Sequence, residues 1–116
     1  MTQYNRADRV GGLIQSTISD ILLRDTGDPR LEMVTISAVK MTRDLRIARV
    51  YFSTSGGDKR IKAAAQALEH AKGFFKRALG NQLNLRYMPD LQFYYDESFD
   101  YGSHIDNILK SISEDQ

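Results

Sequence analysis

The chain has 116 residues, 41% of them hydrophobic and only two of them proline, a composition that excludes a disordered protein and predicts a single folded domain over residues 1–116. It contains no cysteine, which excludes a disulfide framework, a thiolate zinc site and a cysteine nucleophile, and suits a reducing compartment. No segment has the roughly 20 apolar residues of a membrane span, and no apolar run follows the N-terminus as in a secretory signal, so we expect a cytoplasmic protein without membrane contact.

Charge is divided unevenly along the chain, although the formal net charge is only +1. Residues 40–89 hold 11 basic and 3 acidic side chains, whereas residues 90–116 hold 1 basic and 7 acidic ones. A strongly basic segment favours a polyanionic partner, and an ordinary solvated surface is the alternative.

The first predicted element is a helix from about Asn5 to Asp25. Its apolar residues recur at three- and four-residue spacings and fall on one helical face: Val10, Ile14, Ile18, Ile21 and Leu22. Asn5 is a suitable N-cap. The segment Thr26-Gly27-Asp28-Pro29 ends the helix, because glycine tolerates a left-handed cap and proline cannot continue the hydrogen-bond ladder.

Two strands are expected next, over Met33–Met41 and Leu45–Thr54. The apolar residues of the first strand change phase after Ile36, and a slip of one residue predicts a β-bulge at Ser37-Ala38. The second strand alternates cleanly, with apolar residues at Ala48, Val50 and Phe52. One buried and one solvated face fit an antiparallel pair with helices on one side only.

A long helical stretch follows the Gly56-Gly57-Asp58 loop. Its apolar side consists of Ile61, Ala64, Ala65, Leu68, Ala71, Phe75, Ala78 and Leu79. Gly73 lies inside this stretch, where a glycine costs about 1 kcal/mol relative to alanine. It therefore marks either a tolerated defect or a bend at which the backbone comes close to another group.

A third strand is expected where Leu91, Phe93 and Tyr95 alternate, after Pro89 has ended the helical segment. The sequence Ser103-His104-Ile105-Asp106 is a capping box for a last short helix. The element order αββααβ with a terminal helix predicts an α+β fold.

Candidate catalytic and metal-binding residues are sparse. The two histidines, His70 and His104, are far apart in the sequence and accompany no recognisable nucleophile and base, so each is interpreted as a surface or helix-end residue. The acidic cluster of Asp96, Glu97 and Asp100 lacks the spacing of a cation-binding loop and is interpreted as a solvated turn. The sequence therefore predicts neither an enzyme nor a bound metal or cofactor.

Basic residues give better evidence of function. They fall near the expected hairpin, at the start of the long helix and around the glycine inside it: Arg43, Arg46, Arg49, Lys59, Arg60, Lys62, Lys72, Lys76 and Arg77. Because side chains three or four residues apart share a helical face, the last three can present positive charge together beside the backbone of Gly73. Cations beside a closely approachable backbone are typical of RNA-binding modules.

Over almost its whole length, from about Arg6 to Ile112, the chain resembles the ribosome-binding factor A family of bacterial small-subunit assembly factors. The matching stretches, in this order, are Arg9-Val10, Asp28-Pro29-Arg30-Leu31, Val34-Thr35-Ile36, Asp44-Leu45, Ala48-Arg49-Val50-Tyr51, Ala71-Lys72-Gly73-Phe74, Leu85-Arg86, Pro89-Asp90-Leu91-Gln92-Phe93 and Asp96-Glu97-Ser98. Each stretch alone is weak evidence for the family, but the whole series in this order is specific to it.

The resemblance implies a type II KH-like fold. Its three-stranded mixed sheet would be covered on one face by helices, and Ala71-Lys72-Gly73 would form a kink in place of the usual GxxG loop. The implied partner is the free 30S ribosomal subunit with its 16S rRNA, and the implied role is in late maturation, including 16S rRNA 5′-end processing, and in growth at low temperature. We expect a monomer whose RNA-binding residues are Arg43, Arg46, Lys59, Arg60, Lys62, Ala71, Lys72, Gly73, Lys76, Arg77 and Arg86.

Two other hypotheses belong to different classes of protein. The open sheet face, with Arg49, Tyr51 and Tyr94, would serve a protein-interaction or dimerisation module, whose affinity would respond weakly to salt. A hydrolase would need a base and a nucleophile that the sequence does not supply.

Overall fold

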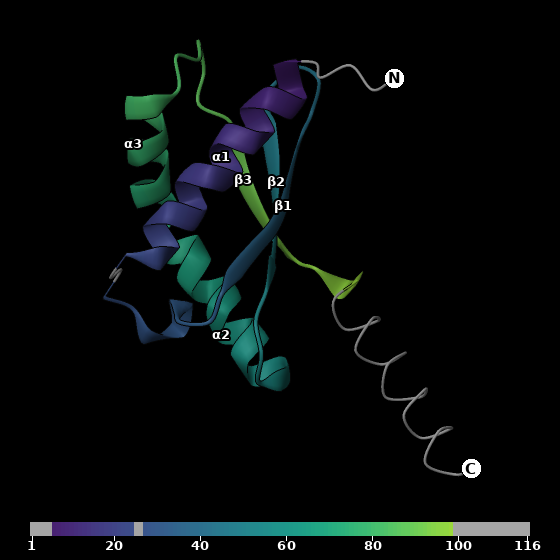
Figure 1. Ribbon diagram of the computed structural model, residues 1–116, viewed down its shortest axis with the longest axis vertical. Coiled ribbons are helices and arrows are strands. Elements are labelled where there is room, and N and C mark those ends of the chain that lie inside the picture. The colour runs from purple at the N-terminus through teal and green to yellow at the C-terminus, as the bar shows by residue number, and fades with distance from the viewer. Residues whose placement is uncertain (1–5, 25–26, 99–116) are drawn as a thin grey trace, which may run out of the picture.

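The computed structural model describes residues 6–24 and 27–98. In chain order the elements are α1 (Arg6–Leu23), the 3-10 turn η1 (Pro29–Leu31), β1 (Thr35–Met41), β2 (Ile47–Ser53), α2 (Gly57–His70), α3 (Lys72–Gln82) and β3 (Asp90–Tyr95). In Figure 1, α2 and α3 follow one another alongside the strands, and α1 crosses the sheet. The predicted αββααβ order is confirmed, whereas the predicted C-terminal helix lies outside the described residues.

The three strands form one mixed sheet in the order β1-β2-β3. Strand β1 pairs with β2 in antiparallel fashion, and β2 pairs with β3 in parallel, so the two parallel strands are joined by the α2–α3 crossover. Ile36 pairs with Phe52 and Ala38 with the neighbouring Tyr51, which leaves Ser37 without a partner residue in β2. The β-bulge predicted from the phase of the apolar residues is confirmed.

Both strands begin two residues later than predicted, at Thr35 and at Ile47. Met33 and Leu45 have φ angles of 68° and 62°, a left-handed conformation outside the β region of regular strands. Leu45 lies in the hairpin turn, where the Asp44 carboxylate accepts hydrogen bonds from the Thr42 hydroxyl (2.6 Å) and the Arg46 amide (3.1 Å). These bonds, that from Thr42 above all, lower the pKa of Asp44 and close the turn between β1 and β2.

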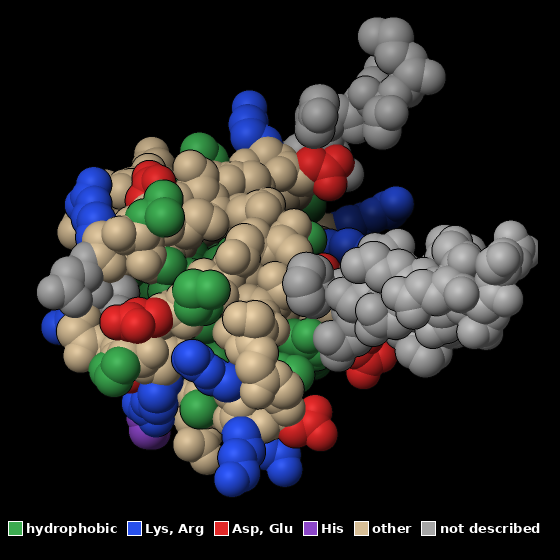
Figure 2. Space-filling model, turned by 60° about the horizontal axis from the view of Figure 1, so that its bottom comes forward, with side chains coloured by type: hydrophobic (Ala, Val, Ile, Leu, Met, Phe, Trp, Pro, Cys, Tyr) green, Lys and Arg blue, Asp and Glu red, His purple; other side chains and the backbone are tan. Residues whose placement is uncertain are grey.

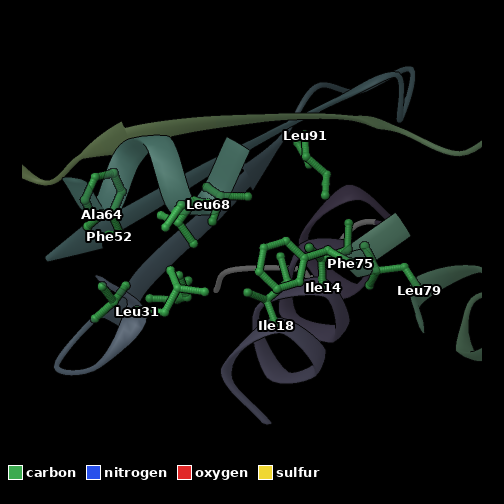
Figure 3. Packing of buried hydrophobic residues seen from close by; sticks show 14 of the residues in the cluster. Ile14, Ile18, Leu31, Phe52, Ala64, Leu68, Phe75, Leu79 and Leu91 are labelled. Atoms are coloured by element: carbon green, nitrogen blue, oxygen red, sulfur yellow. The ribbon is translucent and has the colours of Figure 1, made fainter. Parts of the chain in front are cut away.

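The core lies between one face of the sheet and the three helices (Figure 3). The sheet contributes Ile36, Ala48, Val50, Phe52 and Leu91, all of them buried. The helices contribute Val10, Ile14 and Ile18 from α1, Ala64, Ala67 and Leu68 from α2, and Phe75 and Leu79 from α3. The predicted α+β layering, with helices on one face of the sheet, is confirmed.

A glycine allows α1 to pack closely on the sheet. A Cβ atom at Gly11 would lie 3.0 Å from the carbonyl oxygen of Val39 in β1, and 3.4 Å from the Met41 side chain. On the other side of α1, the Thr17 hydroxyl donates to the Gln82 Oε1 atom at the end of α3 (2.8 Å). Helix α1 is therefore held against both β1 and α3.

Candidate nucleic-acid interface

The long helical stretch bends at Ala71, the first residue of the Ala71-Lys72-Gly73 kink that the family resemblance implies and two residues before the glycine that helix propensity singles out. Ala71 separates α2 from α3 and has φ −84° and ψ −1°. Its amide still donates to the Ala67 carbonyl (3.0 Å), and its carbonyl accepts from the Phe75 amide (3.0 Å). The chain therefore changes direction here while its backbone hydrogen bonds continue through the kink.

Gly73 lies in the first turn of α3 and its conformation does not require glycine. It is exposed, it is absent from the residues with positive φ, and a Cβ atom built on it would meet nothing within 4 Å among the described residues. The predicted close approach of another group is therefore not made by the described part of the chain. The backbone at this point is open to a group from another molecule.

The substitution Gly73→Ala is expected to affect the stability of the fold and the binding of RNA differently. Alanine is the better helix former by at most about 1 kcal/mol, so we expect the free energy of unfolding to stay unchanged or to rise within that limit. If RNA packs against the Gly73 backbone, the added methyl group is expected to weaken binding to the 30S subunit, the partner that the family resemblance implies. Urea unfolding followed by circular dichroism measures the first quantity and co-sedimentation the second. A variant that binds 30S as the wild type does would show that nothing approaches this backbone.

Three basic residues lie just after the kink, and their surroundings differ. Lys72 forms an ion pair with Glu69 (Nζ to Oε2, 3.0 Å), and its Nζ atom lies 5.9 Å from the centre of the Phe93 ring in β3. Lys76, one turn further along α3, is half-buried, whereas Arg77 is exposed. Lys72 and Lys76 share a helical face, and Arg77 lies about 100° further around the helix.

A hollow of about 520 Å³ lies at the kink, between α1, η1 and the two kinked helices. Its walls are largely apolar and include Leu31 and the exposed ring of Phe74. At its rim Arg30 binds the Asp28 carboxylate (Nη2 to Oδ2, 2.8 Å) and lies 3.4 Å from the Nδ1 atom of His70. The hydrogen bonds from Arg30 lower the pKa of Asp28. As expected, His70 ends a helix, and it lies in this polar cluster.

A second basic group lies at the hairpin end of the sheet. The Asp90 amide donates to the Arg46 carbonyl (2.7 Å), which brings the loop before β3 against the hairpin. Arg46, Tyr87 and Met88 line a hollow of about 450 Å³, and the guanidinium carbon of Arg86 lies 5.5 Å from the centre of the Tyr87 ring. Arg43, in the same hairpin turn, is exposed.

The third basic group, Lys59, Arg60 and Lys62, is exposed on the first turns of α2. The seven residues of β2 separate this group from the hairpin, a span of about 20 Å. The candidate residues therefore do not form one patch: they lie at the two ends of the sheet and at the kink. In the view of Figure 2, Lys and Arg side chains gather toward the lower edge of the molecule.

The described residues contain no cluster suited to metal binding, since nowhere in residues 6–24 and 27–98 do three His, Cys, Asp or Glu side chains come together. Asp96 accepts hydrogen bonds from the hydroxyls of Ser37 (2.6 Å) and Ser98, which lower its pKa and make it part of a turn. Asp100 and His104 lie outside the described residues. None of the described helices is long and apolar enough to span a membrane.

One residue that the sequence reading did not name is Lys40. Its Nζ atom lies 5.6 Å from the centre of the Tyr51 ring, on the sheet face opposite the core. The position of Lys40 could have been predicted from the sequence, because a bulge at Ser37 assigns Ala38 and Lys40 to the face that carries Arg49 and Tyr51.

The element order, the mixed sheet and a kinked helix pair flanked by cations define a KH-like domain, a class of nucleic-acid-binding fold. Within that class, the sequence pattern of the family described as ribosome-binding factor A matches residues 6–109. The chain belongs to the ribosome-binding factor A family.

Curated relatives cover nearly the whole chain. Ribosome-binding factor A of Desulfatibacillum aliphaticivorans is 48% identical over 112 residues, which make up 97% of this chain and 91% of the relative. The protein of the same name from Syntrophus aciditrophicus is 45% identical over 116 residues, 100% of this chain and 94% of the relative.

Solved structures confirm the fold. The crystal structure of ribosome-binding factor A from Thermus thermophilus has a TM-score of 0.68 at 23% identity and covers 79% of this chain and 97% of its own. The solution structure of a putative ribosome-binding factor A from Thermotoga maritima has a TM-score of 0.61 at 35% identity and covers 79% of this chain and 91% of its own. A homology model of the Thermus thermophilus ribosome-binding factor A, fitted into the cryo-EM map of a 30S complex, has a TM-score of 0.65 at 22% identity, over 80% of this chain and 97% of its own.

Proposed function

We propose that this protein is a ribosome assembly factor that binds the free 30S subunit through its 16S rRNA. The observation that carries the proposal is the family match over residues 6–109, together with the fold it shares with a relative fitted into a 30S complex. In the finer proposal, the protein acts in the cytoplasm as a monomer and without catalysis. It promotes late maturation of the subunit, including 16S rRNA 5′-end processing, and supports growth at low temperature.

Phosphate contacts from the three basic groups account for the binding in this proposal. The kink offers Lys72, Lys76 and Arg77 beside the open backbone of Gly73, and the hairpin end and the first turns of α2 add further cations. Structured RNA is recognised mainly through its shape and backbone, so cations spread over a span of about 20 Å suit folded rRNA better than a single short strand. The candidate contacts remain the eleven residues from Arg43 to Arg86 named from the sequence.

The salt dependence of 30S binding tests this proposal. Every phosphate contact releases counterions, so raising monovalent salt from about 50 to about 200 mM at constant Mg²⁺ lowers affinity by roughly threefold per contact. Co-sedimentation of the full chain with purified 30S subunits measures the slope. A steep loss of affinity supports binding through rRNA. A nearly flat response would contradict it and would indicate a contact with ribosomal protein, and absence of binding at low salt would contradict the function itself.

A further inference from the structure

The sheet face opposite the core carries an aromatic row beside a cationic row. Strand alternation directs Arg49 and Tyr51 of β2 to this face, together with Lys40 of β1 and Tyr94 of β3, whereas their neighbours Val50 and Phe52 are buried against the helices. Tyr94 keeps 43% of its surface exposed, and Arg49 and Lys40 are also exposed. The helices of the described chain pack on the other face of the sheet.

The pairing register fixes the two rows. Tyr51 pairs with Tyr94 across the parallel strands, and their ring centres are 5.7 Å apart with the planes inclined by 31°. Two residues earlier on β2, about 7 Å away, Arg49 lies between Lys40 on β1 and Gln92 on β3. The Lys40 Nζ atom lies 5.6 Å from the Tyr51 ring, so the rows are in contact.

Charge indicates the kind of occupant. The ion pairs found among the described residues join Arg30 to Asp28 and Lys72 to Glu69, and neither involves Lys40 or Arg49. The carboxylates near this face lie toward the two ends of β3. Asp90 begins the strand, and Asp96 follows its last residue, is held by serine hydroxyls and interacts electrostatically with Lys40. An anionic chain therefore meets positive charge if it crosses the strands along the Lys40–Arg49 row.

Aromatic side chains on an open sheet beside cations are how several sheet-based domains hold unpaired RNA, since every base has a face that stacks on a ring and the phosphates remain for the cations. Each such stack changes affinity by roughly tenfold. An interface with protein would instead favour a depletion of lysine at its centre, and here Lys40 lies over one of the two rings.

We propose that the open sheet face is a second RNA site, which takes an unpaired segment whose bases stack on Tyr94 and Tyr51 and whose phosphates contact Lys40 and Arg49. The site is separate from the kink. Phe93 lies under Lys72 at the kink, and the next residue, Tyr94, points to the opposite face of the sheet. The choice of RNA as the partner rests on the proposed function. The geometry of the site does not.

The test uses the full chain and a fluorescently labelled hexauridine, with affinity measured by anisotropy at low salt. Tyr94→Ala is expected to weaken binding about five- to tenfold. Tyr94→Phe keeps the ring and is expected to bind within about twofold of wild type. The double variant Lys40→Ala with Arg49→Ala is expected to weaken binding at least as much as Tyr94→Ala. Leu13→Ala is the control, because Leu13 is 49% exposed but lies on α1, which packs on the other face of the sheet. It is expected to bind as the wild type does.

A hexauridine carrying 5-iodouracil provides a second readout, since irradiation crosslinks it to a stacked ring. Crosslinks at Tyr94 or Tyr51, located by mass spectrometry, support the site. Crosslinks confined to other residues, or unchanged affinity in Tyr94→Ala, would overturn it. If Tyr94→Ala instead changes the sedimenting mass of the protein without changing hexauridine affinity, the face is a protein contact and the proposal is wrong.

The same variants in the 30S assay keep the two proposals apart. Hexauridine binding that depends on Tyr94 without any binding to 30S subunits would contradict the proposed function alone. Salt-sensitive 30S binding with hexauridine affinity indifferent to Tyr94 would contradict only the sheet site.

Discussion

Replacing Lys72, Lys76 and Arg77 together with glutamate is expected to weaken binding to free 30S subunits by about a hundredfold or more, because the three proposed phosphate contacts would be lost and negative charges would take their place. The fold should survive. Arg77 is exposed and Lys76 is half-buried, and the Lys72–Glu69 pair at the surface contributes at most about 1 kcal/mol. Co-sedimentation at matched salt measures binding, and thermal unfolding checks the fold.

A second charge reversal controls for the protein's overall charge. Changing Arg6 and Arg9 to glutamate alters the net charge by four units, against six in the kink variant, and both residues are exposed on the first turn of α1, outside the hollow at the kink. We expect this control to lose much less affinity, and its slope against salt to stay near that of the wild type. Equal losses in the two variants would mean that total charge, and not the kink, directs binding. Unchanged binding in the kink variant would refute the role of these residues.

Much of the fold could be predicted because the spacing of apolar residues along the chain indicates which face of each helix and strand is buried. Ile14 and Ile18 lie on the predicted helix face and are fully buried, and the alternation of Val50 and Phe52 gave the buried face of β2. The bulge at Ser37 was visible for the same reason: a one-residue slip in a period of two has few other physical causes.

The family resemblance places the kink correctly at Ala71-Lys72-Gly73, whereas the cost of glycine alone would place the bend two residues late, at Gly73. A glycine in the middle of a helix is costly, but Gly73 lies in the first turn of α3, where the helix has only begun. The break falls at Ala71, a good helix former, so local propensity gives no sign of it. Tertiary packing decides the position: Leu68 before the break and Phe75 after it are both fully buried against the same core.

The spatial grouping of the candidate site could not be predicted from counts along the chain. Eleven cations in residues 40–89 suggest one basic surface. In the structure Arg46 lies at one end of β2 and Lys59 beyond the other end, while Lys72 lies over the Phe93 ring at the kink. The exposed pair of Tyr51 and Tyr94 depends on a parallel register between strands about forty residues apart, which no local pattern encodes.

Phe75→Ala is expected to be among the most destabilising single changes in the chain. Its ring is fully buried and lies 6.0 Å, centre to centre, from the ring of Phe93 in β3. Removing a buried phenylalanine side chain costs about 3–5 kcal/mol, a large share of the roughly 5–15 kcal/mol that stabilises a small domain. Phe75 also joins the first turns of α3 to the sheet, so its loss should weaken 30S binding by loosening the helix that carries Lys72 and Lys76.

The neighbouring Phe74 is the natural control, because its side chain is 55% exposed at the rim of the hollow beside the kink. Phe74→Ala should cost less than about 1 kcal/mol. Urea unfolding of both variants, compared by midpoint at equal slope, gives the difference directly. If the two variants unfold within about 1 kcal/mol of one another, then Phe75 does not anchor α3 to the sheet, and the kink depends instead on the contacts of α2. A large difference would show that the packing of Phe75 in the core orients α3 and the basic residues on it. The ring of the neighbouring Phe74 remains exposed on the same helix.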